Sequence, residues 1–335
     1  MLDPHTLLEL LACHSTPGDE DEVRAVLERA WRQAGLRVSR LGDYAVYATT
    51  NRARRRPVLL VTAHMDAPGF AVDAPRVAGG RKERVRLTRL GHPAFVSGRT
   101  AGVLKTRGGK APVVIRKRRR ADGEFDYRCE PAGSERQLPT DLAPGDRVCF
   151  ACEPVCEDDR ISAPFLDNRL GCWLLAELAP RVGAWRDAFD VVLGATAAEE
   201  LGGFGAPVLA RHIQPDLVLV LDATYEASDQ HVLRGGGPVL TLSDASVLLS
   251  PARRDRVKAL FASWGIPLQT EVYNFSGTDA RAFPYQGLAC PVLPLLLATT
   301  GNHTPREAAD LRDAGQLAAA IAHLATSRTA RKNLS

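Results

Sequence analysis

Four uninterrupted apolar segments constrain the fold of this 335-residue chain most strongly. They are PVLLVTA (57–63), FDVVLGAT (189–196), PDLVLVLDA (215–223) and CPVLPLLLAT (290–299). Such runs are typical of parallel strands that are buried on both faces of a sheet. Helical patterns separate several of them, notably at 170–180 and 308–325. This alternation predicts an α/β, three-layer sandwich with a mostly parallel sheet.

The segment 74–157 has a different hydrophobic pattern. It contains short strands with alternating hydrophobicity, separated by Gly- and Pro-rich turns such as RGGK and LAPGD. This pattern is typical of a small all-β unit. We therefore expect a β-barrel-like domain at 74–157, inserted into an α/β domain made of residues 1–73 and 158–335.

Composition excludes some classes of protein. No stretch approaches the roughly 18 to 20 uncharged apolar residues of a membrane-spanning helix, so no membrane partner is expected. The N-terminal segment reads as an amphipathic helix and not as a secretory signal. The seven cysteines are irregularly spaced and odd in number, which argues against a disulfide framework. A reducing, cytoplasmic location is the simplest expectation.

Basic residues gather in one part of the predicted insert. Between Arg76 and Arg120 the chain has fifteen Lys or Arg residues against one acid, Glu83. This segment could bind nucleic acid or acidic ligands. It could equally be a solvated barrel surface or a contact between subunits. The second interpretation is favoured, and no nucleic-acid partner is expected, because no aromatic platform or known nucleic-acid module accompanies the charge.

Each apolar segment is followed at once by a residue that can bind a metal ion. These residues are His64, Glu200, Asp222 and His303, and a further carboxylate, Asp167, precedes a predicted helix. In open α/β sheets, ligands bind beyond the carboxyl ends of the strands. We therefore expect all five side chains to face one crevice. A lone Asp before a helix is more often an N-cap, which stays an alternative for Asp167.

Two histidines and three carboxylates suit zinc, cobalt or manganese. Five ligands are too many for one catalytic zinc ion with an open position. They fit two divalent ions about 3.5–4 Å apart that share a bridging carboxylate.

Glu199 and Glu200 are adjacent, and neighbouring side chains on a strand point in different directions. Their carboxylates are therefore expected to have different roles. Our hypothesis is that Glu200 binds a metal ion while Glu199 takes a proton from the attacking water and gives it to the leaving amine. Asp66 could accept a hydrogen bond from the second ring nitrogen of His64 and so orient the ring.

The residues Thr304-Pro305-Arg306-Glu307 match a capping box with proline at the first helical position. This pattern predicts a helix start there and places His303 in the preceding loop. The remaining histidines lack such a setting and are expected to be surface or structural residues: His5, His14, His92, His212, His231 and His323.

Six blocks occur together in one order: AHMDAPGF (63–70), FLDNRLGC (165–172), AAEELGGFGA (197–206), VLDAT (220–224), SGTDARAF (276–283) and NHTPREAADL (302–311). Together they resemble the M42 family of dinuclear metallo-aminopeptidases, which includes the tetrahedral and glutamyl aminopeptidases. The resemblance covers nearly the whole chain. It departs from the family pattern at Ala67-Pro68, where the family usually has Glu and a small aliphatic residue.

The resemblance implies a role for each candidate residue. Asp167 would bridge both metal ions, His64 and Asp222 would complete one site, and Glu200 and His303 the other. Glu199 would be the general base and Asp66 the orienting carboxylate. Asp279 would lie near the substrate pocket. The inserted β domain would help to build oligomers, from dimers to dodecamers.

The expected reaction is the metal-dependent release of N-terminal residues from short peptides. One alternative is a related M20-type carboxypeptidase or N-acyl amino acid deacylase, but those enzymes place their extra domain after the fourth ligand. A second is a glycosidase, which would not need a metal site of this kind. A third is a non-catalytic nucleic-acid-binding or scaffold protein on a hydrolase fold.

Overall fold

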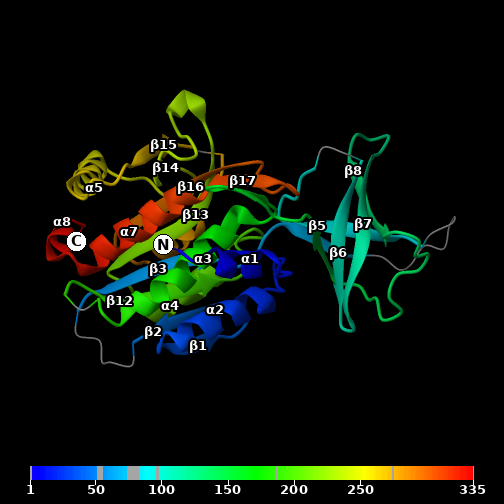
Figure 1. The fold of residues 1–335 in the computed structure, drawn as a ribbon, viewed down its shortest axis with the longest axis horizontal. Coiled ribbons are helices and arrows are strands. Elements are labelled where there is room, and N and C mark those ends of the chain that lie inside the picture. Colours follow the sequence, from blue (N-terminus) through cyan, green and yellow to red (C-terminus); the bar gives the residue numbers. More distant parts are fainter. Residues whose placement is uncertain are drawn as a thin grey trace.

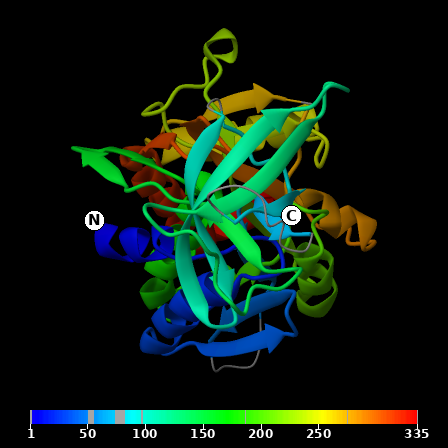
Figure 2. The same cartoon turned by 90° about the vertical axis from the view of Figure 1, so that its right-hand side faces the viewer.

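The computed structural model describes residues 2–50, 56–73, 83–95, 98–185, 187–273 and 275–334. An α/β body holds both termini, and a smaller β-barrel projects from one end of it (Figure 1). Figure 2 turns the barrel toward the viewer, with the α/β body behind it.

One large sheet runs through the α/β body, with strand order β1-β2-β12-β3-β13-β16-β17-β11-β10, and β14 pairs with both β15 and β16. Its strands are β1 (Arg37–Leu41), β2 (Ala45–Thr49), β3 (Val58–His64), β10 (Val155–Glu157), β11 (Arg160–Ala163), β12 (Asp190–Thr196), β13 (Leu217–Tyr225), β14 (Val239–Ser243), β15 (Gln269–Val272), β16 (Val292–Thr300) and β17 (Glu307–Asp310). The central neighbours β12, β3, β13 and β16 are parallel. They are the four apolar segments of the sequence.

Helices cover both faces of this sheet (Figure 1). They are α1 (Pro4–Leu11), α2 (Asp21–Gln33), α3 (Leu166–Val182), α4 (Gly205–Ile213), α5 (Pro251–Ser263), α6 (Ala282–Tyr285), α7 (Leu311–Thr326) and α8 (Arg328–Leu334), with short 3-10 turns at Ser228–Gln230 and Asp279–Arg281. Side chains of β3 alternate between two cores. Leu59 and Val61 join the core that includes α3 and α7, whereas Val58 and Leu60 join the core that includes α4 and α6. The predicted three-layer α/β sandwich is confirmed.

The capping-box prediction at 304–307 is wrong. Glu307 begins strand β17, which pairs with both β11 and β16, so these residues are held by the sheet and not by a helix. Helix α7 starts later, and its N-cap is Asp310, whose side chain accepts a hydrogen bond from the backbone N–H of Arg312 at 3.0 Å. The Thr304 hydroxyl instead donates within a turn, to the carbonyl oxygen of Gly301 at 2.7 Å.

The smaller body is a closed six-strand barrel with order β4-β5-β8-β7-β6-β9. Its strands are β4 (Gly69–Val72), β5 (Val85–Leu90), β6 (Arg99–Thr106), β7 (Gly109–Arg119), β8 (Phe125–Pro131) and β9 (Arg147–Phe150). Aromatic rings of Phe70, Phe95, Tyr127 and Phe150 pack in its core. The predicted boundaries 74–157 differ from the strand pairing at both ends. Strand β4 precedes residue 74, and β10 pairs with β11 of the large sheet.

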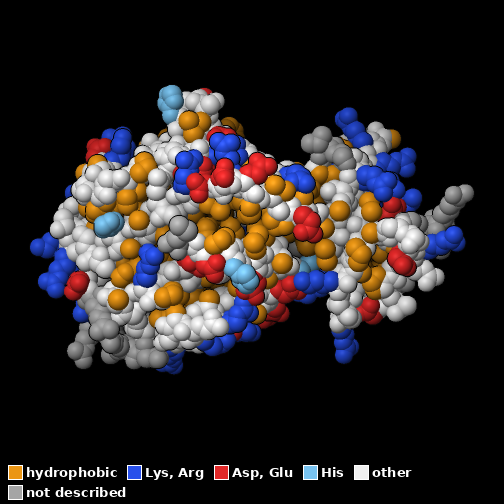
Figure 3. All heavy atoms as spheres, viewed as in Figure 1, with side chains coloured by type: hydrophobic (Ala, Val, Ile, Leu, Met, Phe, Trp, Pro, Cys, Tyr) orange, Lys and Arg blue, Asp and Glu red, His pale blue; other side chains and the backbone are white. Residues whose placement is uncertain are grey.

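The basic run 116–120 lies at the end of β7 and just beyond it, and basic side chains are prominent on the barrel (Figure 3). Arg116 pairs with Glu130 at 2.7 Å, and the Lys117 ammonium lies 4.3 Å from the centre of the Phe125 ring. In the described part of the chain, no helix combines the length and hydropathy that a membrane span requires.

Candidate metal centre

The five predicted ligands converge at the carboxyl ends of the parallel strands. His64 ends β3 and Asp222 lies in β13, two neighbouring strands of the sheet. Glu200 follows β12 and His303 follows β16 in turns. Asp167 lies at the start of α3, where its φ of −81° and ψ of 103° are non-helical and the Asp167–Asn168 peptide bond is cis.

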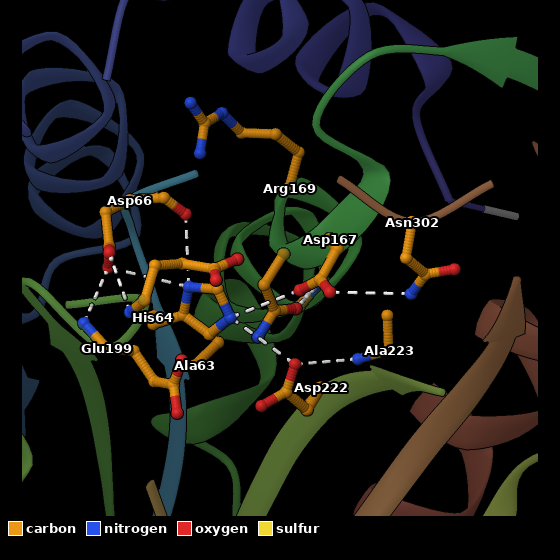
Figure 4. Close-up of polar contacts among 12 residues, drawn as sticks. Ala63, His64, Asp66, Asp167, Arg169, Glu199, Asp222, Ala223 and Asn302 are labelled. Carbon is orange, nitrogen blue, oxygen red and sulfur yellow. Dashed lines mark hydrogen bonds and ion pairs between the residues drawn. The ribbon is translucent and has the colours of Figure 1, made fainter. Parts of the chain in front are cut away.

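His64, Asp167 and Asp222 form the first cluster. His64 Nε2 lies 3.2 Å from Asp167 Oδ1 and 3.3 Å from Asp222 Oδ1 (Figure 4). One ligand atom from each residue lies within 4.8 Å of the others. The three side chains are buried, with exposed fractions of 2%, 7% and 8%, so bulk water has little access to this cluster.

Asp167, Glu200 and His303 form the second cluster. His303 Nε2 lies 3.2 Å from Glu200 Oε1 and 3.5 Å from Asp167 Oδ2. Asp167 therefore offers one oxygen to each cluster. The N-cap interpretation of Asp167 is not supported, because no side-chain cap hydrogen bond is made at the start of α3.

The chemistry of these residues fits two divalent ions. Apart from the histidine contacts given above, Asp167 Oδ1 and Glu200 Oε1 have no hydrogen-bond partner among the residues that the structure describes, although buried oxygens normally have one. Burial also raises the pKa of Asp222 to about 7 and raises that of Glu200. Burial acts in the same direction on Asp167, but the neighbouring His303 and His64 outweigh it and hold that pKa well below its usual range. Crowded carboxylates of this kind are stabilised by bound cations.

Asp66 is fully buried near the site. It contacts His64 through its backbone carbonyl and not, as predicted, through its carboxylate. The Asp66 backbone carbonyl lies 3.1 Å from His64 Nδ1, whereas its nearest carboxylate oxygen lies 3.6 Å away. The carboxylate accepts hydrogen bonds of 3.0 Å from the backbone N–H groups of Glu199 and Glu200. These donors are free because β12 ends at Thr196 and the two glutamates form a turn, not a strand as the sequence suggested.

The two adjacent glutamates still point to different places. Glu200 contacts His303, as described above, while Glu199 Oε1 lies 3.8 Å from the guanidinium of Arg281. The Glu199 side chain is 10% exposed, and burial, with the charges of Asp279 and Asp222, raises its pKa well above the usual value. Figure 4 shows Glu199 on the His64 side of the first cluster.

Asp279 is buried behind the end of β12. Its Oδ2 accepts a hydrogen bond of 2.5 Å from the Thr196 hydroxyl, and its exposed fraction is 2%. It does not line the cavity beside the clusters.

Glu307, which the sequence pattern predicts to belong to a helix cap, instead contacts the backbone of two candidate ligands. Its carboxylate accepts hydrogen bonds from the backbone N–H groups of Asp167 at 2.8 Å and His303 at 2.9 Å. It thereby supports residues of both clusters while being 1% exposed. In the sequence, Glu307 is marked only by its place four residues after His303, and that place fits a helix cap equally well.

Three further supporting residues had no recognisable signal. Arg169 is fully buried and donates to the Met65 carbonyl oxygen at 2.6 Å, beside His64. Glu20 accepts a hydrogen bond from the backbone N–H of Ala198 at 3.1 Å and so holds the turn with the two glutamates. Asn302 Nδ2 lies 3.5 Å from Asp167 Oδ2.

A cavity of about 100 Å³ opens beside the two clusters. The lining residues are His64, Asp167, Glu199, Glu200, Asp222, Ala223, Thr224, Tyr225, Asp244, Glu271, Tyr273, Ser276, Gly277, Thr278, Leu296, Asn302 and His303. All five candidate ligands and Glu199 therefore face one space.

Comparisons with known proteins identify the family of this chain. The M42 glutamyl aminopeptidase family model matches residues 129–319. A glutamyl aminopeptidase of Lactococcus lactis is 25% identical, over 82% of this chain and 81% of the relative. A relative from Acetivibrio thermocellus is 28% identical but is matched over only 52% of its own length and 50% of this chain.

The fold is shared with solved structures. The TET1 peptidase of Pyrococcus horikoshii superimposes with a TM-score of 0.82 at 21% identity, covering 96% of this chain and 99% of that one. That protein assembles into a tetrahedron or a large octahedral shell. These findings do not favour the M20-type or non-catalytic alternatives. The chain belongs to the M42 family of glutamyl aminopeptidases, and the resemblance seen in the sequence is confirmed.

Proposed function

We propose that this metal-dependent aminopeptidase uses two divalent ions, held by five residues, to release N-terminal residues from short peptides. The observation that carries the proposal is that one carboxylate, Asp167, belongs to both three-residue clusters. His64 and Asp222 would hold one ion with it, and Glu200 and His303 the other. Mixed histidine and carboxylate donors suit zinc, with cobalt or manganese as alternatives.

When bound, the two ions would polarise the scissile carbonyl and make water a better nucleophile. Glu199 lines the same cavity as the five ligands without being needed as one of them. It would take the proton from the attacking water on its carboxylate and deliver it to the nitrogen of the leaving amine. The Asp66 carboxylate positions Glu199 and Glu200 by holding both backbone N–H groups.

The assembly and location of the protein belong to the same proposal. We infer a homo-oligomer in which the β-barrel forms subunit contacts, because a protein with this fold, the TET1 peptidase, forms large shells. We infer a reducing, cytoplasmic compartment, which is supported by seven cysteines that are all free thiols.

Metal removal tests the proposal. The protein would be stripped with a chelator, dialysed and titrated with Zn²⁺, Co²⁺ or Mn²⁺, while release of leucine from Leu-Gly-Gly is measured. Activity should be lost on stripping and should return as the second ion per subunit binds. Full activity in the stripped protein would contradict the proposal, as would saturation at one ion per subunit.

A further inference from the structure

Part of the wall of the active-site cavity, formed by residues other than the candidate metal ligands, is acidic. Besides Glu199, two carboxylates that belong to neither cluster line the cavity, and they are Asp244 and Glu271. No lysine or arginine lines the cavity among the residues that the structure describes. Two divalent ions would offset the charge of the ligand carboxylates and Glu199, so Asp244 and Glu271 would leave this wall negative.

Asp244 has one carboxylate oxygen in use and one available. Its Oδ1 accepts hydrogen bonds from the Ser246 backbone N–H at 2.6 Å, the Ser246 hydroxyl at 2.7 Å and the Val247 backbone N–H at 2.7 Å. Its Oδ2 receives no hydrogen bond within the described part of the chain. The turn therefore fixes the carboxylate at the cavity wall while leaving an acceptor for a ligand.

Glu271 adds a second, buried carboxylate to this wall. Its two oxygens accept hydrogen bonds from the hydroxyls of Thr224 at 2.6 Å and Thr241 at 2.7 Å. Two hydroxyl donors stabilise the ionised form, although burial raises the pKa of Glu271. The residue is 5% exposed, so water screens its charge poorly.

Two aromatic rings line the same cavity as these acids. Tyr225 and Tyr273 both line the cavity, and their ring centres lie 5.9 Å apart. Flat rings next to a carboxylate suit a side chain with an apolar stem and a positive end, because the stem packs on the rings and the cation is attracted to their faces.

We propose that this cavity selects peptides whose N-terminal residue is lysine or arginine, with Asp244 as the partner of the side-chain cation. The inference rests on the proposed aminopeptidase function and goes beyond it by naming the substrate class. The acidic wall would repel an N-terminal glutamate, although the family model carries the name glutamyl aminopeptidase. Arg281, whose guanidinium lies 3.8 Å from Glu199, does not line the cavity.

The test compares p-nitroanilides of lysine, norleucine and glutamate with metal-loaded protein. Norleucine has the unbranched stem of lysine without its ammonium group, so the ratio of kcat/KM for lysine and norleucine isolates the charge. We expect lysine to exceed norleucine by about tenfold or more, the effect of a close charge pair. Glutamate should be the poorest of the three.

The variant Asp244→Asn keeps the shape of the side chain and an Oδ1 acceptor for the turn. It should lower the lysine-to-norleucine ratio by about tenfold. Asp229→Asn, at an exposed carboxylate outside the cavity, is the matched control and should leave the ratio unchanged. A second readout is independent of turnover: lysinamide should raise the Tm of the wild-type protein more than norleucinamide does, and Asp244→Asn should abolish that difference.

The outcomes separate this inference from the function on which it rests. Hydrolysis of norleucine p-nitroanilide without a preference for lysine would keep the aminopeptidase and overturn the specificity. A preference for glutamate, or a lysine-to-norleucine ratio unchanged in Asp244→Asn, would also overturn it. No hydrolysis of any of the three substrates by metal-loaded protein would contradict both.

Discussion

Glu307 Oε2 accepts a hydrogen bond of 2.8 Å from the backbone N–H of Asp167, a residue 140 positions earlier in the chain. The contact joins strand β17 to the start of α3. It fixes the backbone that presents the one carboxylate shared by both clusters. The other oxygen of Glu307 does the same for His303, so a single buried acid positions ligands of both predicted metal ions.

Replacing Glu307 with glutamine should therefore weaken metal binding. An amide can place its oxygen opposite only one of the two backbone N–H groups, and its NH₂ would face the other. Changes to residues that orient metal ligands typically cost about 10- to 100-fold in metal affinity. Competition with a chromophoric chelator measures this loss.

Thr304→Ala is the matched control for Glu307→Gln. Thr304 is the residue that the sequence pattern assigned as an N-cap, but in the structure its hydroxyl bonds only within an exposed turn. Its removal should leave metal affinity unchanged. Equal losses in the two variants would contradict the role of Glu307.

Asp167 and His303 should differ in how many metal ions they hold. Asp167→Asn removes a ligand charge from both clusters, whereas His303→Ala removes a ligand from one. We expect the Asp167→Asn protein to retain less than one ion per subunit, because both clusters lose a charged ligand. The His303→Ala protein should retain about one ion, because the cluster of His64, Asp167 and Asp222 keeps all its ligands. Elemental analysis after gel filtration gives the stoichiometry, and two ions retained in Asp167→Asn would rule out a bridging carboxylate.

Glu199→Gln should separate metal binding from turnover. Glutamine preserves the size of the side chain and leaves the five ligands intact, but it cannot accept a proton. A loss of general-base function lowers kcat by about 10²- to 10⁴-fold. Metal content, measured on the same sample, should match the wild type. Wild-type kcat in this variant would show that the base is another group.

Much of the fold and of the site was predictable because both depend on local pattern. The buried runs that became β3, β12, β13 and β16 are unbroken, and the residues that follow them could be assigned to one crevice by the rule for parallel strands. The prediction that failed, a helix start at 304–307, depends on how strands from distant parts of the chain pair. The sequence 304–307 satisfies the rules for a cap, yet β11 and β16 bind β17 instead.

Contacts between segments that are far apart in the chain could not be predicted from the sequence. Nothing near Glu20 or Arg169 reveals that they hold backbone groups of the site, because their partners are brought close only by the fold. Asp66 shows the same limit. Its proximity to His64 was predictable, but its bonds to the turn at Glu199 arise from a turn that was expected to be strand.

A buried ion pair outside the site predicts a pH-dependent stability. His14 is 2% exposed, and its Nδ1 lies 3.1 Å from Asp19 Oδ2. Burial lowers the pKa of His14, but Cys149 and Asp19 outweigh it and raise that pKa from 6.5 to about 9. Because the folded-state pKa is the higher one, the stabilisation is complete below pH 6.5 and is lost as the pH rises through 9.

The free energy of unfolding should thus fall by up to about 3 kcal/mol across this window. Urea unfolding of the metal-free protein at several pH values between 6.5 and 9 measures the slope. His14→Asn should remove most of it, with Asp229→Asn as a surface control. Parallel curves for wild type and His14→Asn would show that His14 does not carry the protonation change.

In the proposed mechanism, two three-residue clusters that share Asp167 hold the ions needed to remove N-terminal residues. The most direct measurement is hydrolysis of paired short peptides, free or acetylated at the N-terminus, by metal-loaded wild type and by Asp167→Asn. We predict release of single residues from free N-termini only, and at least about a 10²-fold loss in Asp167→Asn. Cleavage of the acetylated peptides, release from the C-terminus, or undiminished activity of Asp167→Asn would contradict this account.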